Sequence, residues 1–131
     1  MLFFAPGYEI KILEGVISGA LGRLYTLLGN QDKASEYFDQ AFSKLSKEID
    51  KPRLHFLRIK GDYANHLSTL GKNDAAEDLY REIIPFIEKL GVLDHPLVIA
   101  SLPGFLKVLF ENGKANEALG FSDKIIVFED I

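Results

Sequence analysis

Three short stretches of the chain decide its fold: LGNQDKA at residues 28–34, LGKNDAA at 70–76 and NGKANEA at 112–118. Each contains a glycine, at positions 29, 71 and 113, so the same interval of 42 residues occurs twice. An alanine follows each glycine by five residues: Ala34, Ala76 and Ala118. A constant period with matching neighbours is the signature of a tandem repeat. The sequence therefore predicts one domain over 1–131, built from three copies of a unit at 8–49, 50–91 and 92–131.

On both sides of each glycine, apolar residues recur at intervals of three and four, which is the spacing of one helix face. The first copy shows this as Leu21, Leu24, Tyr25 and Leu28 before its glycine. Alternation of period two is nearly absent, so strands are not expected. The pattern predicts an all-α chain with helices near 8–28, 31–49, 53–70, 73–91, 95–112 and 115–128.

Glycine, proline and acidic residues agree with these helix boundaries. A central glycine suits the left-handed position that ends many helices, and Asp32, or Asn73 or Asp74 in the second copy, can cap the next helix or favour its start. Pro52 and Pro96 fall at the joints between copies, each after an aspartate (Asp50 and Asp94). Pro85 and Pro103 fall inside expected helices, where we expect kinks. Pro103 can alternatively mark a helix that starts late.

These residues resemble the tetratricopeptide repeat, whose pattern has a Leu-Gly-x-x-Tyr stretch, a turn glycine, spaced alanines and an aromatic residue. The first copy carries the stretch as residues 21–25, followed by Gly29, Ala34, Phe38 and Ala41. The third copy departs from the pattern at Leu106 and Ser122. The period of 42 exceeds the common 34 and is similar to the longer-helix variant of kinesin light chains and many bacterial signalling proteins. The resemblance implies a right-handed α-solenoid of three antiparallel helix pairs.

In this family the first helix of each pair lines the concave side, which is the usual ligand surface. The resemblance thus places candidate peptide-binding positions six, three and two residues before each glycine, and one turn earlier. The candidates are Arg23, Thr26, Leu27, Arg58, Asn65, Ser68, Lys107, Phe110 and Glu111. Such a mixed polar, slightly basic surface suits an extended peptide or an acidic segment. The alternative is that these residues are ordinary solvated helix faces.

A carboxylate clamp, as used by chaperone-binding members of the family, is not expected. The matching positions hold Gly19, Arg23, Asp62, Ala100 and Gly104, and only one of these is a cation. The resemblance therefore implies binding of another protein or peptide without that terminal-carboxylate chemistry.

Composition and motifs give no indication of an enzyme. The chain has no cysteine, a formal charge of −4 and no basic stripe, so we expect no nucleic acid, membrane, metal or cofactor as a partner, and a cytoplasmic location. His55 and His66 are too far apart along one helix to share a metal. His66 is expected to be packed, with Asp62 as its hydrogen-bond partner.

Two functions remain open from the sequence. The first is a protein- or peptide-binding scaffold module, as part of a larger assembly or longer chain. The second is a peptide- or ligand-sensing regulatory domain of a bacterial signalling or transcription protein. The apolar residues 125–128 near the C-terminus also predict self-association into a homodimer or larger oligomer, through Ile125 and Phe128 with Phe3 or Phe4.

Overall fold

The computed structural model describes residues 6–46, 54–90, 95 and 101–129, and the side chains of 6–9, 87, 90 and 124–129 lie outside that description. Within these residues the chain is helical and contains no strand. The helices are α1 (Pro6–Leu27), α2 (Gln31–Lys44), α3 (Leu54–Thr69), α4 (Asn73–Leu90), α6 (Leu102–Glu111) and α7 (Ala115–Glu129). This confirms the all-α prediction.

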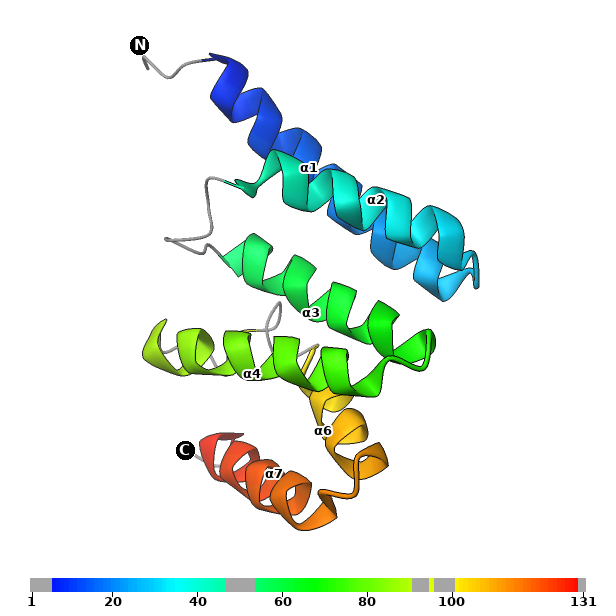
Figure 1. The fold of residues 1–131 in the computed structure, drawn as a ribbon. Helices are drawn as coiled ribbons and strands as arrows, with labels where there is room; N and C mark the ends of the chain where they lie inside the picture. Colours follow the sequence, from blue (N-terminus) through cyan, green and yellow to red (C-terminus); the bar gives the residue numbers. More distant parts are fainter. Residues whose placement is uncertain (1–5, 47–53, 91–94, 96–100, 130–131) are drawn as a thin grey trace.

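The helices form three antiparallel pairs, α1 with α2, α3 with α4, and α6 with α7, stacked along one direction (Figure 1). The first helices of successive pairs are neighbours, because α3 packs against α1 and α6 packs against α3. The second helix of each pair also packs against the first helix of the next pair. The result is a right-handed α-solenoid with the two chain ends at opposite ends of the stack.

The three turns have the same geometry, as the period predicts. Gly29, Gly71 and Gly113 have φ angles of 79°, 80° and 77°, and no other described residue has a positive φ. In each turn the amide after the glycine donates to a carbonyl five residues back, for example Asn30 N to Tyr25 O at 2.9 Å. This is the Schellman arrangement, and it accounts for the glycine at each of these positions.

Two groups of buried side chains hold the stack together. Phe38, Ala41, Leu45, Phe56 and Ile59 belong to the first group, which joins α2 to α3. The second group joins α3 and α4 to α6, and its members are Leu57, Ala64, Ala76, Tyr80, Ile83, Ile84, Leu102, Phe105, Val108 and Leu109. Because α3 contributes to both groups, no pair has a core of its own, as expected for a repeat architecture.

Close approach within the first pair depends on Gly22. A Cβ at this position would lie 2.9 Å from the ring of Phe38, too near for any side chain. The equivalent residues are Ala64 and Tyr80 in the second copy, and Leu106 and Ser122 in the third. In the third copy the large residue of this pair of positions is therefore on the first helix and the small residue on the second.

Two details differ from the sequence prediction, and one agrees with it. The last first-helix begins at Leu102 and places Pro103 in its first turn, so the late start is correct and the mid-helix kink at Pro103 is wrong. The side chain that caps α2 is Asn30, which accepts from Lys33 N at 3.1 Å, whereas Asp32 lies inside the first turn. Pro85 lies inside α4, as predicted. Pro52 and Pro96 lie outside the described residues.

Candidate functional site

A hollow of about 320 Å³ lies on the side of the stack formed by the first helices. Five of the nine candidate residues line it, from α1 and α3: Arg23, Thr26, Leu27, Arg58 and Asn65. The rest of its wall is made by Gly61, Asp62, Tyr80, Ser101, Pro103 and Gly104. The hollow therefore spans all three helix pairs. Its size is that of a small ligand pocket.

Two guanidinium groups and one carboxylate give the hollow its charge. Arg58 Nε lies 3.4 Å from Asp62 Oδ1, one turn along α3. Burial raises the pKa of Asp62, while the charges of Arg58 and Arg23 oppose that rise. Arg23 is exposed and forms no ion pair with the described residues. The net charge of these three groups is positive, which suits an anionic group of a ligand.

Small residues make room for the hollow on α3 and α6. A Cβ at Gly61 would lie 2.7 Å from Ser101 Cβ, so the backbones of α3 and α6 approach closely here. Tyr80 lies in the wall of the hollow, and its hydroxyl donates a hydrogen bond of 3.5 Å to the Gly61 carbonyl. Burial raises the pKa of that hydroxyl. The sequence did not indicate Tyr80 as a candidate, because it lies on the second helix of its pair and the candidates came from the first helices.

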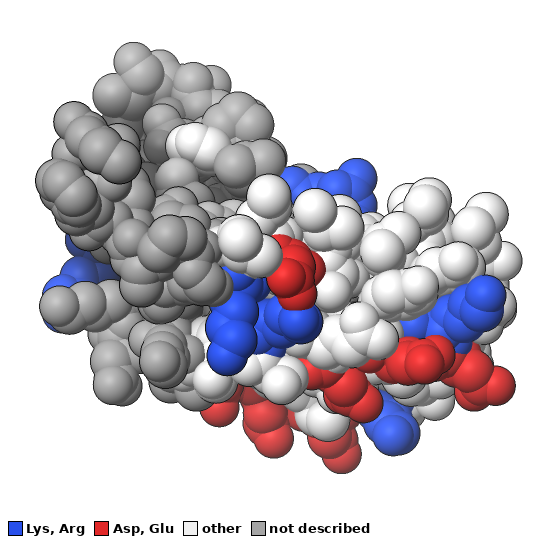
Figure 2. All heavy atoms as spheres, turned by 90° about the horizontal axis from the view of Figure 1, so that it is seen from above, with Lys and Arg blue, Asp and Glu red and all other residues white. Residues whose placement is uncertain are grey.

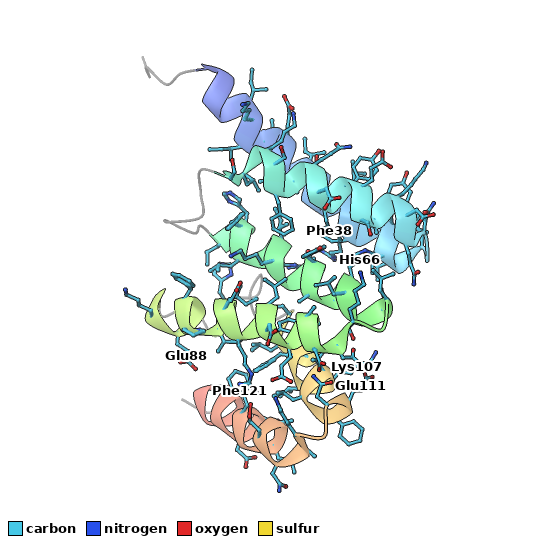
Figure 3. The ribbon with its side chains drawn as sticks, in the orientation of Figure 1. Phe38, His66, Glu88, Lys107, Glu111 and Phe121 are labelled. Carbon is cyan, nitrogen blue, oxygen red and sulfur yellow. The ribbon has the colours of Figure 1, made fainter. Side chains whose placement is uncertain are left out.

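The other four candidates do not line this hollow. The Ser68 hydroxyl donates to Asn73 Oδ1 at 3.0 Å, and this bond directs it toward the start of α4. Lys107 and Glu111 lie one turn apart on α6 with 3.9 Å between their charged groups (Figure 3), and Phe110 is 69 % exposed. All three of these residues lie on α6, the first helix of the third pair, and the structure describes no further helix pair beyond it.

His66 is fully buried where the first pair meets the second (Figure 3). Its Nε2 lies 2.8 Å from Ser35 Oγ and its Nδ1 lies 3.5 Å from Thr26 Oγ1. Burial and then the Lys72 charge lower the pKa of His66, and Asp39 opposes them. The expectation of a packed histidine is confirmed. The partner predicted for it is wrong, because Asp62 instead lies beside Arg58.

A polar cluster that the sequence reasoning missed joins the second pair to the third. Glu77 accepts from Lys114 at 2.6 Å, from Arg81 at 2.8 Å and from Asn112 at 2.8 Å. These bonds lower the pKa of Glu77 to about 2. The pairing of Glu77 with Arg81 has the helical spacing of four residues and could have been found from sequence. The contacts with Asn112 and Lys114 cross 35 and 37 positions, which no local pattern indicates.

Comparison with known proteins bears on the fold. No protein-family model and no curated protein matches the chain. A matching crystal structure, from Podosopora anserina, is described as a kinesin light chain with nearly identical TPR-like repeats, where TPR stands for tetratricopeptide repeat. The TM-score is 0.73 and the sequence identity is 19 %. The match covers 86 % of this chain.

The chain has a TPR-like repeat fold. The resemblance inferred from the 42-residue period is thereby confirmed at the level of three-dimensional structure. The chain spans 53 % of the length of the matched TPR-like structure.

The described residues were also compared with what a metal site and a membrane-spanning helix require. No group of three or more histidine, aspartate or glutamate side chains there is arranged to hold a metal ion. Among the described helices, none combines the length and apolar character that crossing a bilayer requires.

Proposed function

We propose that this chain is a scaffold module that binds an extended, acidic segment of another protein along the side formed by α1, α3 and α6. The observation that supports the proposal most is the 320 Å³ hollow, which collects Arg23, Arg58 and Asn65 from two successive pairs. The proposed role is non-catalytic and cytoplasmic. It draws on the repeat fold and on the chemistry of this hollow.

The chemistry of the hollow favours a peptide over a folded surface as its ligand. A pocket of this size accommodates one or two side chains of an extended segment. The amide of Asn65 can hydrogen-bond the backbone of that segment, and Arg23 offers a guanidinium to a carboxylate. Leu27, which is 70 % exposed, and Pro103 add apolar surface at the edge. An acidic side chain flanked by apolar residues fits this combination.

Binding of three labelled peptides of equal length, one acidic, one neutral and one basic, tests the proposal by fluorescence anisotropy. We expect the acidic peptide to bind more tightly than the neutral one, and the basic peptide not to bind. The affinity should fall as the salt concentration rises, since the attraction is between exposed charges. Equal binding of all three peptides, or none by the acidic peptide, would refute the proposed function.

Matched variants localise the binding. Arg23→Gln removes one positive charge from the hollow, and Lys89→Gln removes one from the exposed part of α4. We expect Arg23→Gln and Asn65→Ala each to weaken acidic-peptide binding at least fivefold, while Lys89→Gln leaves it unchanged. If Arg23→Gln and Lys89→Gln weakened binding equally, the peptide would respond to overall charge rather than to this hollow.

A further inference from the structure

The contact between the first and second pairs shows how one unit of this chain accepts the next. His66 of α3 lies between Thr26 at the end of α1 and Ser35 at the start of α2. It is fully buried there. Because the repeat has a period of 42 residues, each of these three positions has an equivalent position in the first or the third copy, at an end of the stack.

At the ends of the stack the equivalent residues are large, apolar and exposed. The position of His66 corresponds, 42 residues earlier, to Leu24, which is 49 % exposed. The positions of Thr26 and Ser35 correspond, 84 residues later, to Phe110 and Leu119, which are 69 % and 63 % exposed. The three polar residues of the first junction are therefore matched by three apolar residues at the ends of the stack. Leu24 is at the α1 end, and Phe110 and Leu119 are at the α6–α7 end.

The α1 end carries further residues of the same kind. Ile17 is 51 % exposed, whereas Ile59, its equivalent in α3, is 4 % exposed because it packs over Gly19 of α1. Ile10 and Leu13 continue the exposed stripe toward the start of the helix at intervals of three and four residues. Figure 2 looks onto this end of the stack. Its described part shows uncharged side chains mainly on the right, and charged side chains at the centre and along the lower edge.

We propose that copies of this chain associate head to tail, with Phe110 and Leu119 of one copy packing around Leu24 of the next. The occupant of the α1 face is thus the α6–α7 end of a second copy, which presents Phe110 and Leu119 at the positions equivalent to Thr26 and Ser35 of the first junction. The contact continues the internal stacking of the repeat. A head-to-tail contact joins two different surfaces, so it adds copies without a built-in stop.

Pro103 of α6 limits how closely the α6–α7 end of one copy can approach α1 of the next. In the two internal junctions Gly19 faces Ile59 of α3 and Gly61 faces Ser101, the residue before α6. The equivalent residue of the last pair is Pro103. The proline ring occupies the space in which each of those glycines accommodates a side chain of the next pair. Contact between copies is therefore concentrated near the interhelical turns, at Phe110, Leu119 and Leu24, rather than along the whole of α1.

Two single-face variants test the proposal by sedimentation velocity over a wide range of protein concentration. Leu24→Arg blocks the α1 face and Phe110→Arg blocks the opposite face, and both add the same charge. We expect the wild-type mass to rise with concentration and each variant alone to remain monomeric, with self-association weakened at least tenfold. An equimolar mixture of the two variants should form a species of two chains and nothing larger, because each partner retains one complementary face.

The possible results separate the alternatives. A wild-type chain that stays monomeric, or a mixture of variants that stays monomeric, would overturn the proposal. Continued association of Phe110→Arg alone would indicate that two α1 faces pair symmetrically, which also overturns it. Phe86→Arg changes an exposed apolar residue on α4 and should leave self-association unaltered. Circular dichroism should show native helicity for every variant, because the three substituted side chains are exposed.

Cross-linking provides a second readout that does not depend on affinity. The chain has no cysteine, so Leu24→Cys and Leu119→Cys introduce one thiol each. Under oxidising conditions we expect a disulfide-linked dimer from the mixture of these two variants and none from either variant alone. Faster cross-linking of Leu24→Cys with itself than with Leu119→Cys would contradict the head-to-tail arrangement.

Discussion

Glu77 is the residue whose charge ties the second helix pair to the third. It is 5 % exposed, and its carboxylate accepts hydrogen bonds from Arg81 on its own helix. It also accepts hydrogen bonds from Asn112 and Lys114, which lie in the turn between α6 and α7. Three donors satisfy a buried carboxylate, so its negative charge is stabilised in the folded chain. Arg81 also reaches Glu117 at 2.5 Å, which extends the cluster onto α7.

The substitution Glu77→Gln should lower the free energy of unfolding by about 1–2 kcal/mol, because the charge-assisted bonds become neutral while Arg81 and Lys114 remain partly solvated. Urea denaturation at neutral pH measures this. Glu82→Gln, at an exposed position of the same helix, should change it by less than about 0.5 kcal/mol. Equal effects of the two substitutions would show that the cluster does not stabilise the junction.

The same residue predicts a pH dependence. The pKa of Glu77 is about 2 in the folded chain and 4.5 when unperturbed, so the unfolded chain takes up this proton at higher pH. The stabilising contribution is complete above pH 4.5 and is lost as the pH falls toward 2. The wild-type unfolding free energy should therefore fall more steeply over this range than that of Glu77→Gln. Parallel curves for the two proteins would contradict the assignment.

Sequence reasoning reached the buried residues more readily than their polar partners. The packing of His66 was predicted, and Phe38, which occupies the aromatic position of the repeat pattern, is buried. The partner of His66 was assigned wrongly to Asp62, because one turn of separation was the only proximity that the sequence offered. Its actual neighbours, Ser35 and Thr26, come from the preceding pair, and only the stacking of the two pairs brings them within reach.

At the scale of elements, each helix pair has one small and one large residue at the positions equivalent to Gly22 and Phe38. Gly22 faces Phe38 in the first pair, and Leu106 with Ser122 occupies the equivalent positions in the third. Both residues of the third pair are half-buried. If the two departures compensate one another, their effects on stability must depend on one another.

A double-mutant cycle tests this compensation. Leu106→Ala should cost about 1–2 kcal/mol of unfolding free energy by leaving a cavity, and Ser122→Phe should cost a similar amount by overpacking. The double variant should be more stable than the sum of the two losses predicts, by at least about 1 kcal/mol, because the introduced ring fills the space left by Leu106. Strict additivity would show that the two side chains do not share one space.

Helix ends show where pattern reasoning at this scale stops. The glycine period fixed three turns correctly, since only a left-handed residue suits each position. Proline was ambiguous, because it is accepted in a first turn and also occurs inside bent helices. Pro103 proved to be the first case and Pro85 lies inside α4. Tertiary contacts decide between such alternatives, and the sequence pattern does not contain them.

At the scale of the whole molecule, stacking creates two kinds of surface that no single pair possesses. One is the hollow between α1, α3 and α6, and the other comprises the two ends where the repeat is left without a neighbour among the described pairs. The sequence indicated which residues precede each turn, and five of these meet in the hollow. Ser68 and the three α6 candidates do not, because the hollow depends on the junction between pairs rather than on repeat position alone.

Peptide binding along the first helices is the central claim, and backbone NMR measures it most directly. A titration of the isotope-labelled chain with the acidic peptide should shift the amide signals of Arg23, Arg58 and Asn65 in a saturable way. Signals from the exposed residues of α2 and the exposed half of α4 should stay in place. Saturable shifts confined to α2 and α4, or no shifts at any peptide concentration, would contradict the account.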